Sequence, residues 1–152
     1  MGTLRVLFVC THNSARSQMA EGFLREYGGD RFEVFSAGTE ATAVRPEAIR
    51  AMAEVGIDIS GHQSKTVDRY LGQSFAWVIT VCDQAREACP IFPGAVETAH
   101  WGFDDPSGAT GDEDARMAVF RRVRDEIARR VRMFALAAGR PDAPEPQPTV
   151  LS

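Results

Sequence analysis

The sequence predicts an α/β domain built on a mostly parallel, four-stranded sheet with helices on both faces. Short apolar runs rich in β-branched and aromatic residues, such as 4–9 and 77–81, are typical of strands that are buried on both faces. Segments with helical periodicity separate these runs, and strands that alternate with helices form parallel sheets. We therefore expect a three-layer sandwich, in which ligands bind beyond the carboxyl ends of the strands.

The first strand–helix unit covers the first 28 residues. The apolar run 4–9 predicts a buried strand that ends at Cys10, and a helical pattern starts at Ala15. Consecutive glycines, Gly28 and Gly29, end this helix. Its buried face is predicted from three apolar residues spaced four apart, namely Met19, Phe23 and Tyr27.

One strong strand and four further elements follow. A short strand is predicted over 32–35, and a helix is predicted to begin at Pro46, whose missing N–H costs nothing in a first helical turn. The run 77–81 predicts a second buried strand, followed by Cys82 and a short helical segment. The segment 96–101 is a weaker candidate for the fourth strand.

The final helix has the clearest pattern, and the tail after it has the opposite character. Apolar residues spaced three or four apart predict an amphipathic helix docked on the core, formed by Phe120, Val123, Ile127, Val131 and Phe134. From Gly139 onward, four prolines among polar residues cannot pack. We expect a single catalytic domain over 1–138 and a disordered tail over 139–152.

Composition excludes several classes of protein. The chain has 152 residues and a net charge of −4, which is too acidic for a general nucleic-acid binder. It contains no apolar run of the roughly 20 residues that would span a membrane, and it shows no secretory leader. Three cysteines match no secreted disulfide scaffold. We expect a monomeric cytoplasmic protein whose thiols do chemistry.

The loop after the first strand has the residues of an oxyanion site. Cys10 and Arg16 lie six positions apart across a strand-to-helix loop, whose backbone N–H groups can surround a tetrahedral anion. The Arg16 guanidinium can clamp two oxygens of this anion. The same positive field favours the thiolate of Cys10, to which the hydroxyls of Thr11 and Ser17 could donate. The expected substrate-binding residues are Thr11, His12, Asn13, Ser14, Ala15, Arg16 and Ser17.

These residues also carry a resemblance to a known family. Cys10, five residues, Arg16 and Ser17, followed by Gln18-Met19-Ala20-Glu21-Gly22, resemble the low-molecular-weight tyrosine phosphatase superfamily, and most closely its arsenate reductase branch. The segments Ser36-Ala37-Gly38 and His100-Trp101-Gly102-Phe103-Asp104-Asp105-Pro106 extend the resemblance, which runs from Leu4 to Phe134. The loop motif indicates the superfamily, whereas two further cysteines indicate the branch.

The resemblance implies a thiol relay that reduces arsenate to arsenite. A phosphatase needs one thiol, whereas the reduction takes two electrons, which two thiols supply by forming a disulfide. The expected order is attack by Cys10 on arsenic, release of arsenite by Cys82, and transfer of the disulfide to Cys82 and Cys89. External thioredoxin then reduces that disulfide, and no bound cofactor or metal is expected.

The spacing of the last two cysteines predicts a conformational change. Seven residues of regular helix would separate the Cα atoms of Cys82 and Cys89 by about 10 Å. A disulfide needs roughly 4.4 to 6.8 Å. We therefore expect residues 83–88 to unwind when the pair oxidises.

Two other residues follow from the resemblance. Asp105, which directly precedes Pro106, is the expected general acid that protonates the departing oxygen of arsenate. Some relatives bind a potassium ion close to Asn13, Glu21 and Ser36 with help from an acidic residue near position 65. Because this chain has Lys65, its ammonium could take the place of such an ion.

Alternative interpretations remain open at this point. The chain could be a phosphatase acting on phosphotyrosine or small phosphate esters, which would not require Cys82 or Cys89. It could also be an oxyanion or redox sensor that binds without turnover. The two later cysteines could be inert buried residues, or could form a zinc site with a histidine, although His12, His62 and His100 are scattered along the chain.

Overall fold

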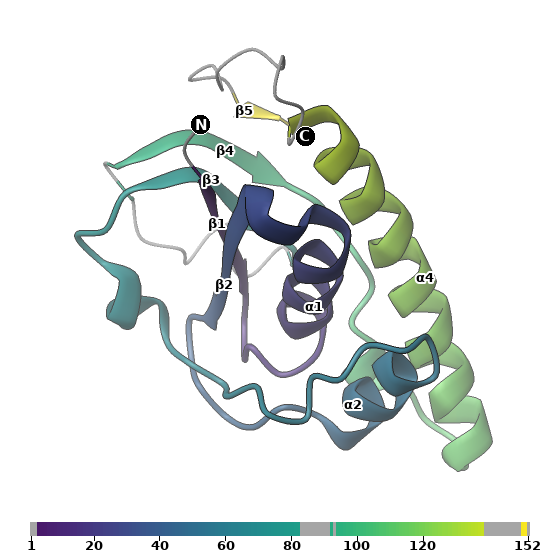
Figure 1. The fold of residues 1–152 in the computed structure, drawn as a ribbon. Coiled ribbons are helices and arrows are strands. Elements are labelled where there is room, and N and C mark those ends of the chain that lie inside the picture. The colour runs from purple at the N-terminus through teal and green to yellow at the C-terminus, as the bar shows by residue number, and fades with distance from the viewer. Residues whose placement is uncertain (1–2, 83–91, 93, 139–149, 152) are drawn as a thin grey trace.

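A single parallel sheet organises the molecule (Figure 1). The computed structural model describes residues 3–82, 92, 94–138 and 150–151. The strand order is β2-β1-β3-β4-β5, and every neighbouring pair is parallel. The parallel α/β fold predicted from the sequence is confirmed. The strands are β1 (Leu4–Cys10), β2 (Phe32–Gly38), β3 (Phe75–Thr80), β4 (Ala95–His100) and β5 (Val150–Leu151).

In the described part of the chain, three α-helices are present, and they pack against the sheet or against one another. Helix α1 lies against β1 and β2 and also against α4, while α2 packs on α4 (Figure 1). Among the described residues, no helix is long and apolar enough to cross a membrane. The helices are α1 (Arg16–Gly28), α2 (Pro46–Ala53) and α4 (Glu113–Ala138).

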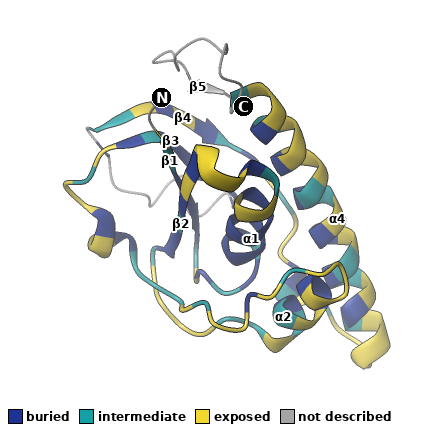
Figure 2. Cartoon of the chain, viewed as in Figure 1, coloured by how far each residue is buried: buried dark blue, intermediate teal, exposed yellow. Residues whose placement is uncertain are grey.

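Aromatic side chains cover both faces of the sheet. On the face toward α4, the Phe134 ring lies 5.8 Å from Phe32, 5.2 Å from Trp77 and 5.5 Å from Trp101, between ring centroids. Phe32 and Phe35 are three residues apart in one strand, so their side chains point to opposite faces. The second face therefore carries the cluster that the rings of Phe35, Tyr70, Phe75 and Phe92 form. Figure 2 shows that the strands and the inner sides of the helices are the buried parts.

The structure changes some predicted bounds. Strand β2 continues past the predicted end at Phe35, because its last three residues keep pairing with Phe8, Val9 and Cys10 of β1. Strand β5 lies within the tail for which disorder was predicted, and it pairs with Thr98 and Ala99. The rest of that tail, and the helical segment predicted after Cys82, lie outside the described residues.

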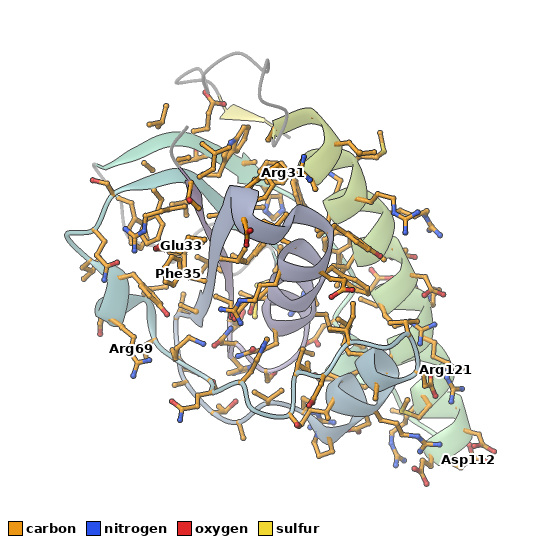
Figure 3. All side chains as sticks on the ribbon, viewed as in Figure 1. Arg31, Glu33, Phe35, Arg69, Asp112 and Arg121 are labelled. Atoms are coloured by element: carbon orange, nitrogen blue, oxygen red, sulfur yellow. The ribbon has the colours of Figure 1, made fainter. Side chains whose placement is uncertain are left out.

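A charged cluster joins the end of α2 to α4. Arg121 and Arg124 both donate to the Glu54 carboxylate, with N–O distances of 2.8 and 2.9 Å, and Arg124 also donates to the Ala51 carbonyl. Figure 3 shows Arg121 on α4. The hydrogen bond from Arg121, aided by the charges of both guanidinium groups, lowers the pKa of Glu54 from 4.5 to about 2.

This cluster predicts a pH dependence of stability. Because the pKa of Glu54 is lowered by folding, its contribution is complete above pH 4.5 and is lost as the pH falls toward 2. We expect Glu54→Gln to lower the melting temperature at neutral pH and to lose this effect on acidification. Thermal unfolding of both proteins between neutral pH and pH 2 measures the difference. Glu126→Gln, at an exposed i,i+4 pair with Arg122, is the control, and an effect of Glu54→Gln that is independent of pH would contradict the prediction.

Candidate active site

The carboxyl ends of the strands meet at one edge of the sheet, and the predicted anion loop, residues 10–17, lies there. Cys10 is the last residue of β1, and Arg16 is the first of α1. The loop rests on the end of β2, where a Cβ on Gly38 would lie 2.6 Å from the Thr11 carbonyl oxygen and 2.7 Å from the Asn13 nitrogen. Only glycine allows the loop and β2 to approach this closely.

The amino terminus of α1 keeps its positive end free for an anion. No acidic residue occurs in its first turn, and Ala15, which precedes the helix, provides no side-chain cap. Unpaired N–H groups at a helix start, together with the helix dipole, attract negative charge. The local sequence therefore favours anion binding next to Cys10.

Arg16 connects the anion loop to the predicted acid. Its side chain is 11% exposed, and one guanidinium nitrogen donates to the Phe103 carbonyl at 3.1 Å. Another lies 3.5 Å from the Asp105 carboxylate, which also accepts from the Ser107 N–H. Asp104, by contrast, pairs with Arg122 of α4 at 3.3 Å. The structure thus brings Asp105 to the anion loop.

Two thiols lie at the same edge. Cys10 and Cys82 are 3% and 4% exposed, and both are free. Cys82 follows Val81, whose N–H donates to the Val9 carbonyl, so the chain after β3 continues alongside the end of β1. The Cys10 sulfur lies 2.9 Å from the Ser17 hydroxyl. The predicted nucleophile, the Ser17 hydroxyl and a second thiol therefore lie close together.

The Thr11 hydroxyl contacts the second thiol. The sequence assigned this hydroxyl to Cys10, whereas the structure shows it 3.1 Å from the Cys82 sulfur. Thr11 follows the end of β1 and Cys82 lies just past the end of β3, the strand that pairs with β1, so the two residues meet at this edge. Thr11 thereby links the anion loop to Cys82.

The remaining residues of the anion loop are mostly buried or contact neighbouring segments. Asn13 is fully buried with a φ of 51°, and the Ser14 carbonyl accepts from the Arg45 N–H. Ala15 is also buried. His12, which the sequence placed among the substrate-binding residues, has a half-exposed side chain that lies 3.2 Å from the Glu40 carboxylate.

Gln18, a polar residue behind the loop, was not predicted as part of the site. Gln18 is fully buried and donates to the Asn13 side-chain oxygen at 2.9 Å, and Asn13 in turn donates to Ser17 and Ser36 at 2.8 and 3.0 Å. A sequence signal existed, because Ser17, Gln18 and Glu21 are polar on a helix whose neighbouring positions are core. A polar group buried in this way requires partners.

The carboxylate of Glu21 is already paired with side chains of the protein. It accepts from Ser36 and lies 2.6 Å from Arg25, at one wall of an open pocket of 280 Å³. Lys65 lines the same pocket and donates to the Gln63 carbonyl at 2.7 Å, and burial lowers the pKa of its ammonium. Lys65 therefore adds a positive charge to the pocket that Glu21 lines, where the resemblance raised the question of a potassium ion.

Two expectations fall on residues that the structure does not describe. Cys89 and the segment 83–88, predicted to unwind, lie outside the described residues. Within the described part of the chain, no group of three or more His, Cys, Asp or Glu side chains is arranged to hold a metal ion. A zinc site that includes Cys89 is not tested by this observation.

Comparisons with known proteins agree with this geometry. The family model of low molecular weight phosphotyrosine protein phosphatases matches residues 5–142. An arsenate reductase of Halalkalibacterium halodurans is 52% identical over 130 residues, which are 86% of this chain and 94% of the relative.

Solved structures extend the comparison. A structure described as an arsenate reductase in the phosphate binding state superposes with a TM-score of 0.74 and 34% identity, covering 88% of this chain and 98% of that one. The thioredoxin-dependent arsenate reductase of Corynebacterium glutamicum gives a TM-score of 0.61 and 29% identity, covering 87% and 60% of the two chains.

Proposed function

Because the chain belongs to the low molecular weight phosphotyrosine protein phosphatase family, we propose that it uses the family's anion loop to reduce arsenate to arsenite. The 52% identity to a curated arsenate reductase supports this choice within the family. The observation that carries it is the pair of buried free thiols, Cys10 and Cys82, at the ends of adjacent strands.

In the first step, the anion loop holds arsenate for attack by Cys10. Arg16 and the backbone N–H groups at the start of α1 bind the oxyanion, and the Ser17 hydroxyl stabilises the Cys10 thiolate. The sulfur forms a bond to arsenic, and one oxygen departs as water. Asp105, 3.5 Å from Arg16, supplies the proton to the departing oxygen as the general acid.

In the second step, Cys82 displaces arsenic from the Cys10 sulfur. The Cys82 thiolate attacks the Cys10 sulfur, a disulfide forms, and the electron pair of the S–As bond stays on arsenic. Arsenic is thereby reduced from the +5 to the +3 state and leaves as arsenite. The contact between the Thr11 hydroxyl and the Cys82 sulfur supports this role, because a hydroxyl donor favours the attacking thiolate.

The enzyme then returns to its reduced form. Cys89 attacks Cys82, which releases Cys10 as a thiolate and leaves a Cys82–Cys89 disulfide. A dithiol reductant, thioredoxin, reduces this bond, and the name of the Corynebacterium glutamicum neighbour supports such coupling. We further propose that the protein acts as a monomer in the cytoplasm, where thiols are kept reduced.

A coupled assay tests the proposed function. We expect NADPH to be consumed when the protein, arsenate, thioredoxin and thioredoxin reductase are mixed, with one arsenite formed for each NADPH. Phosphate in place of arsenate is the control, because phosphorus(V) offers no comparable reduction. Consumption that does not depend on arsenate, or none at all, would contradict the proposal.

The alternative within the family is a phosphatase. The anion loop binds tetrahedral oxyanions of either element, so weak hydrolysis of p-nitrophenyl phosphate is compatible with both functions. Only the reductase requires Cys82, however. If the protein hydrolyses p-nitrophenyl phosphate rapidly but shows no arsenate-dependent NADPH consumption, the phosphatase function is favoured.

A further inference from the structure

A chain of hydrogen bonds leads from His62, on the wall of the open pocket, to the Cys10 sulfur. His62 Nδ1 lies 2.9 Å from Gln18 Oε1, and Gln18 Nε2 donates to Asn13 Oδ1 at 2.9 Å. Asn13 Nδ2 donates to Ser17 Oγ at 2.8 Å, and Ser17 Oγ lies 2.9 Å from Cys10 Sγ. Gln18, Asn13 and Ser17 are fully buried, so water does not compete for these bonds.

Backbone groups decide the orientation of the Gln18 amide. Its Nε2 lies 3.2 Å from the Asn13 carbonyl oxygen and 2.9 Å from the Gln63 carbonyl oxygen. Carbonyl oxygens only accept hydrogen bonds, so the nitrogen of this amide must face them. Gln18 Oε1 therefore faces His62 and accepts a hydrogen bond from its Nδ1.

The orientation of Asn13 is decided in the same way. The Lys65 backbone N–H donates to Asn13 Oδ1 at 2.9 Å, and this group can only donate. Asn13 Nδ2 must then face the two hydroxyls. Ser36 passes its own hydrogen to the Glu21 carboxylate and so accepts from Asn13.

This polarity determines which way the Ser17 hydroxyl points. Since Ser17 Oγ accepts from Asn13 Nδ2, its own hydrogen is directed to the Cys10 sulfur, where it stabilises negative charge. A reversed Asn13 amide would instead draw the Ser17 hydrogen to its oxygen. The direction of one hydroxyl therefore depends on amides that lie behind the loop.

We infer that Gln18 is a positioning residue for the Cys10 nucleophile, acting through Asn13 and Ser17, and that His62 holds Gln18 in place from the pocket. The role in arsenate reduction rests on the proposed function, whereas the effect on the thiolate does not. Gln18 also holds Asn13 in its left-handed backbone conformation, because it contacts both the carbonyl and the side-chain oxygen of that residue.

The surroundings of His62 suit the neutral ring that this chain of bonds requires. Its Nε2 lies 3.3 Å from an Arg25 nitrogen, so it accepts from Arg25 while Nδ1 donates to Gln18. Burial lowers the pKa of His62, and the charges of Arg25 and Lys65 act in the same direction, whereas Glu21 and Asp58 oppose them. The neutral form is therefore favoured.

Alkylation of individual cysteines by iodoacetamide tests the inference without arsenate or thioredoxin. The three cysteines fall in three separate tryptic peptides, residues 6–16, 70–86 and 87–116, so mass spectrometry follows each thiol alone. We expect Gln18→Met, which keeps the shape but loses both hydrogen-bonding groups, to slow alkylation of Cys10 about tenfold near pH 6, the loss expected for a hydrogen bond to a charged group. Near pH 10, where thiols ionise without help, its rate should equal that of the natural protein.

Two variants of His62 supply a matched pair. His62→Asn keeps an N–H donor close to the position of Nδ1. His62→Leu introduces a side chain of nearly the same shape as asparagine but without a donor. We expect His62→Asn to stay within about twofold of the natural rate near pH 6, and His62→Leu to fall about threefold or more, because only the second loses the bond to Gln18.

The outcomes separate the inference from its rivals. Equal alkylation profiles for Gln18→Met and the natural protein would overturn it, as would a loss of the same size at both pH values, which indicates altered access. If Gln18→Met does not fold, the two His62 variants provide the test. Equal rates of Cys10 alkylation for His62→Asn and His62→Leu would then overturn the inference. A protein that shows the expected shift but no arsenate reduction would leave the inference standing and remove the proposed function.

Discussion

We expect Cys82→Ser to stop multiple turnover of arsenate, with no arsenite released from the enzyme. The variant keeps Cys10, Arg16 and the anion loop, so arsenate still reacts once at Cys10. Without the second thiol, the electron pair of the S–As bond cannot pass to arsenic by disulfide formation. The NADPH-coupled assay should therefore fall to the background rate, and prior incubation with arsenate should protect Cys10 from alkylation.

Cys89→Ser is the matched control for this prediction. It retains Cys10 and Cys82, so it should release one arsenite per chain and then stop with a Cys10–Cys82 disulfide. The two variants thus differ by a single countable arsenite, which identifies the order of the thiols. Sustained turnover by Cys82→Ser would refute the relay, since Cys82 would then have no part in the chemistry.

Arg16→Lys lowers kcat/KM for arsenate by about a hundredfold or more, because a point charge replaces a planar clamp for two oxygens of the anion. The substitution also removes the hydrogen bond to the Phe103 carbonyl and the ion pair with Asp105. We expect both substrate binding and protonation of the departing oxygen to suffer. Initial rates over a range of arsenate concentrations measure the change.

Arg122→Lys provides the comparison for Arg16→Lys. Arg122 pairs with Asp104, next to Asp105, but its side chain is half-exposed and lies outside the anion loop. Exposed ion pairs contribute little, so we expect kcat/KM to stay within about twofold of the natural value. If Arg16→Lys were as mild as this control, Arg16 would not be the clamp of the substrate.

Local sequence patterns predicted the architecture because they depend on neighbours along the chain. The runs at 4–9 and 77–81 became β1 and β3 with small shifts, and the period of the last helix placed Phe120, Val123 and Ile127 in the core of α4. The same holds for the anion loop, whose cysteine and arginine are positioned by a strand end and a helix start. Such patterns predict structure well when all the residues that form them lie in one segment of the chain.

Long-range packing decided what these patterns could not. The extension of β2 to Gly38 depends on pairing with β1, and the contact between Thr11 and Cys82 joins residues 71 positions apart. The hydrogen bonds of Gln18 reach Asn13 on one side and Gln63 and His62 on the other. None of these contacts follows from periodicity, because each depends on which segments the fold brings together.

By itself, the sequence determined a parallel α/β domain, and it predicted an oxyanion loop with a nucleophilic cysteine and an arginine. Only the tertiary structure decided which hydroxyl serves which thiol, and in which direction the hydrogen bonds behind the loop run. The physical reason is that strand and helix formation are governed by residues a few positions apart, whereas a buried polar group takes its partner from whatever segment packs against it.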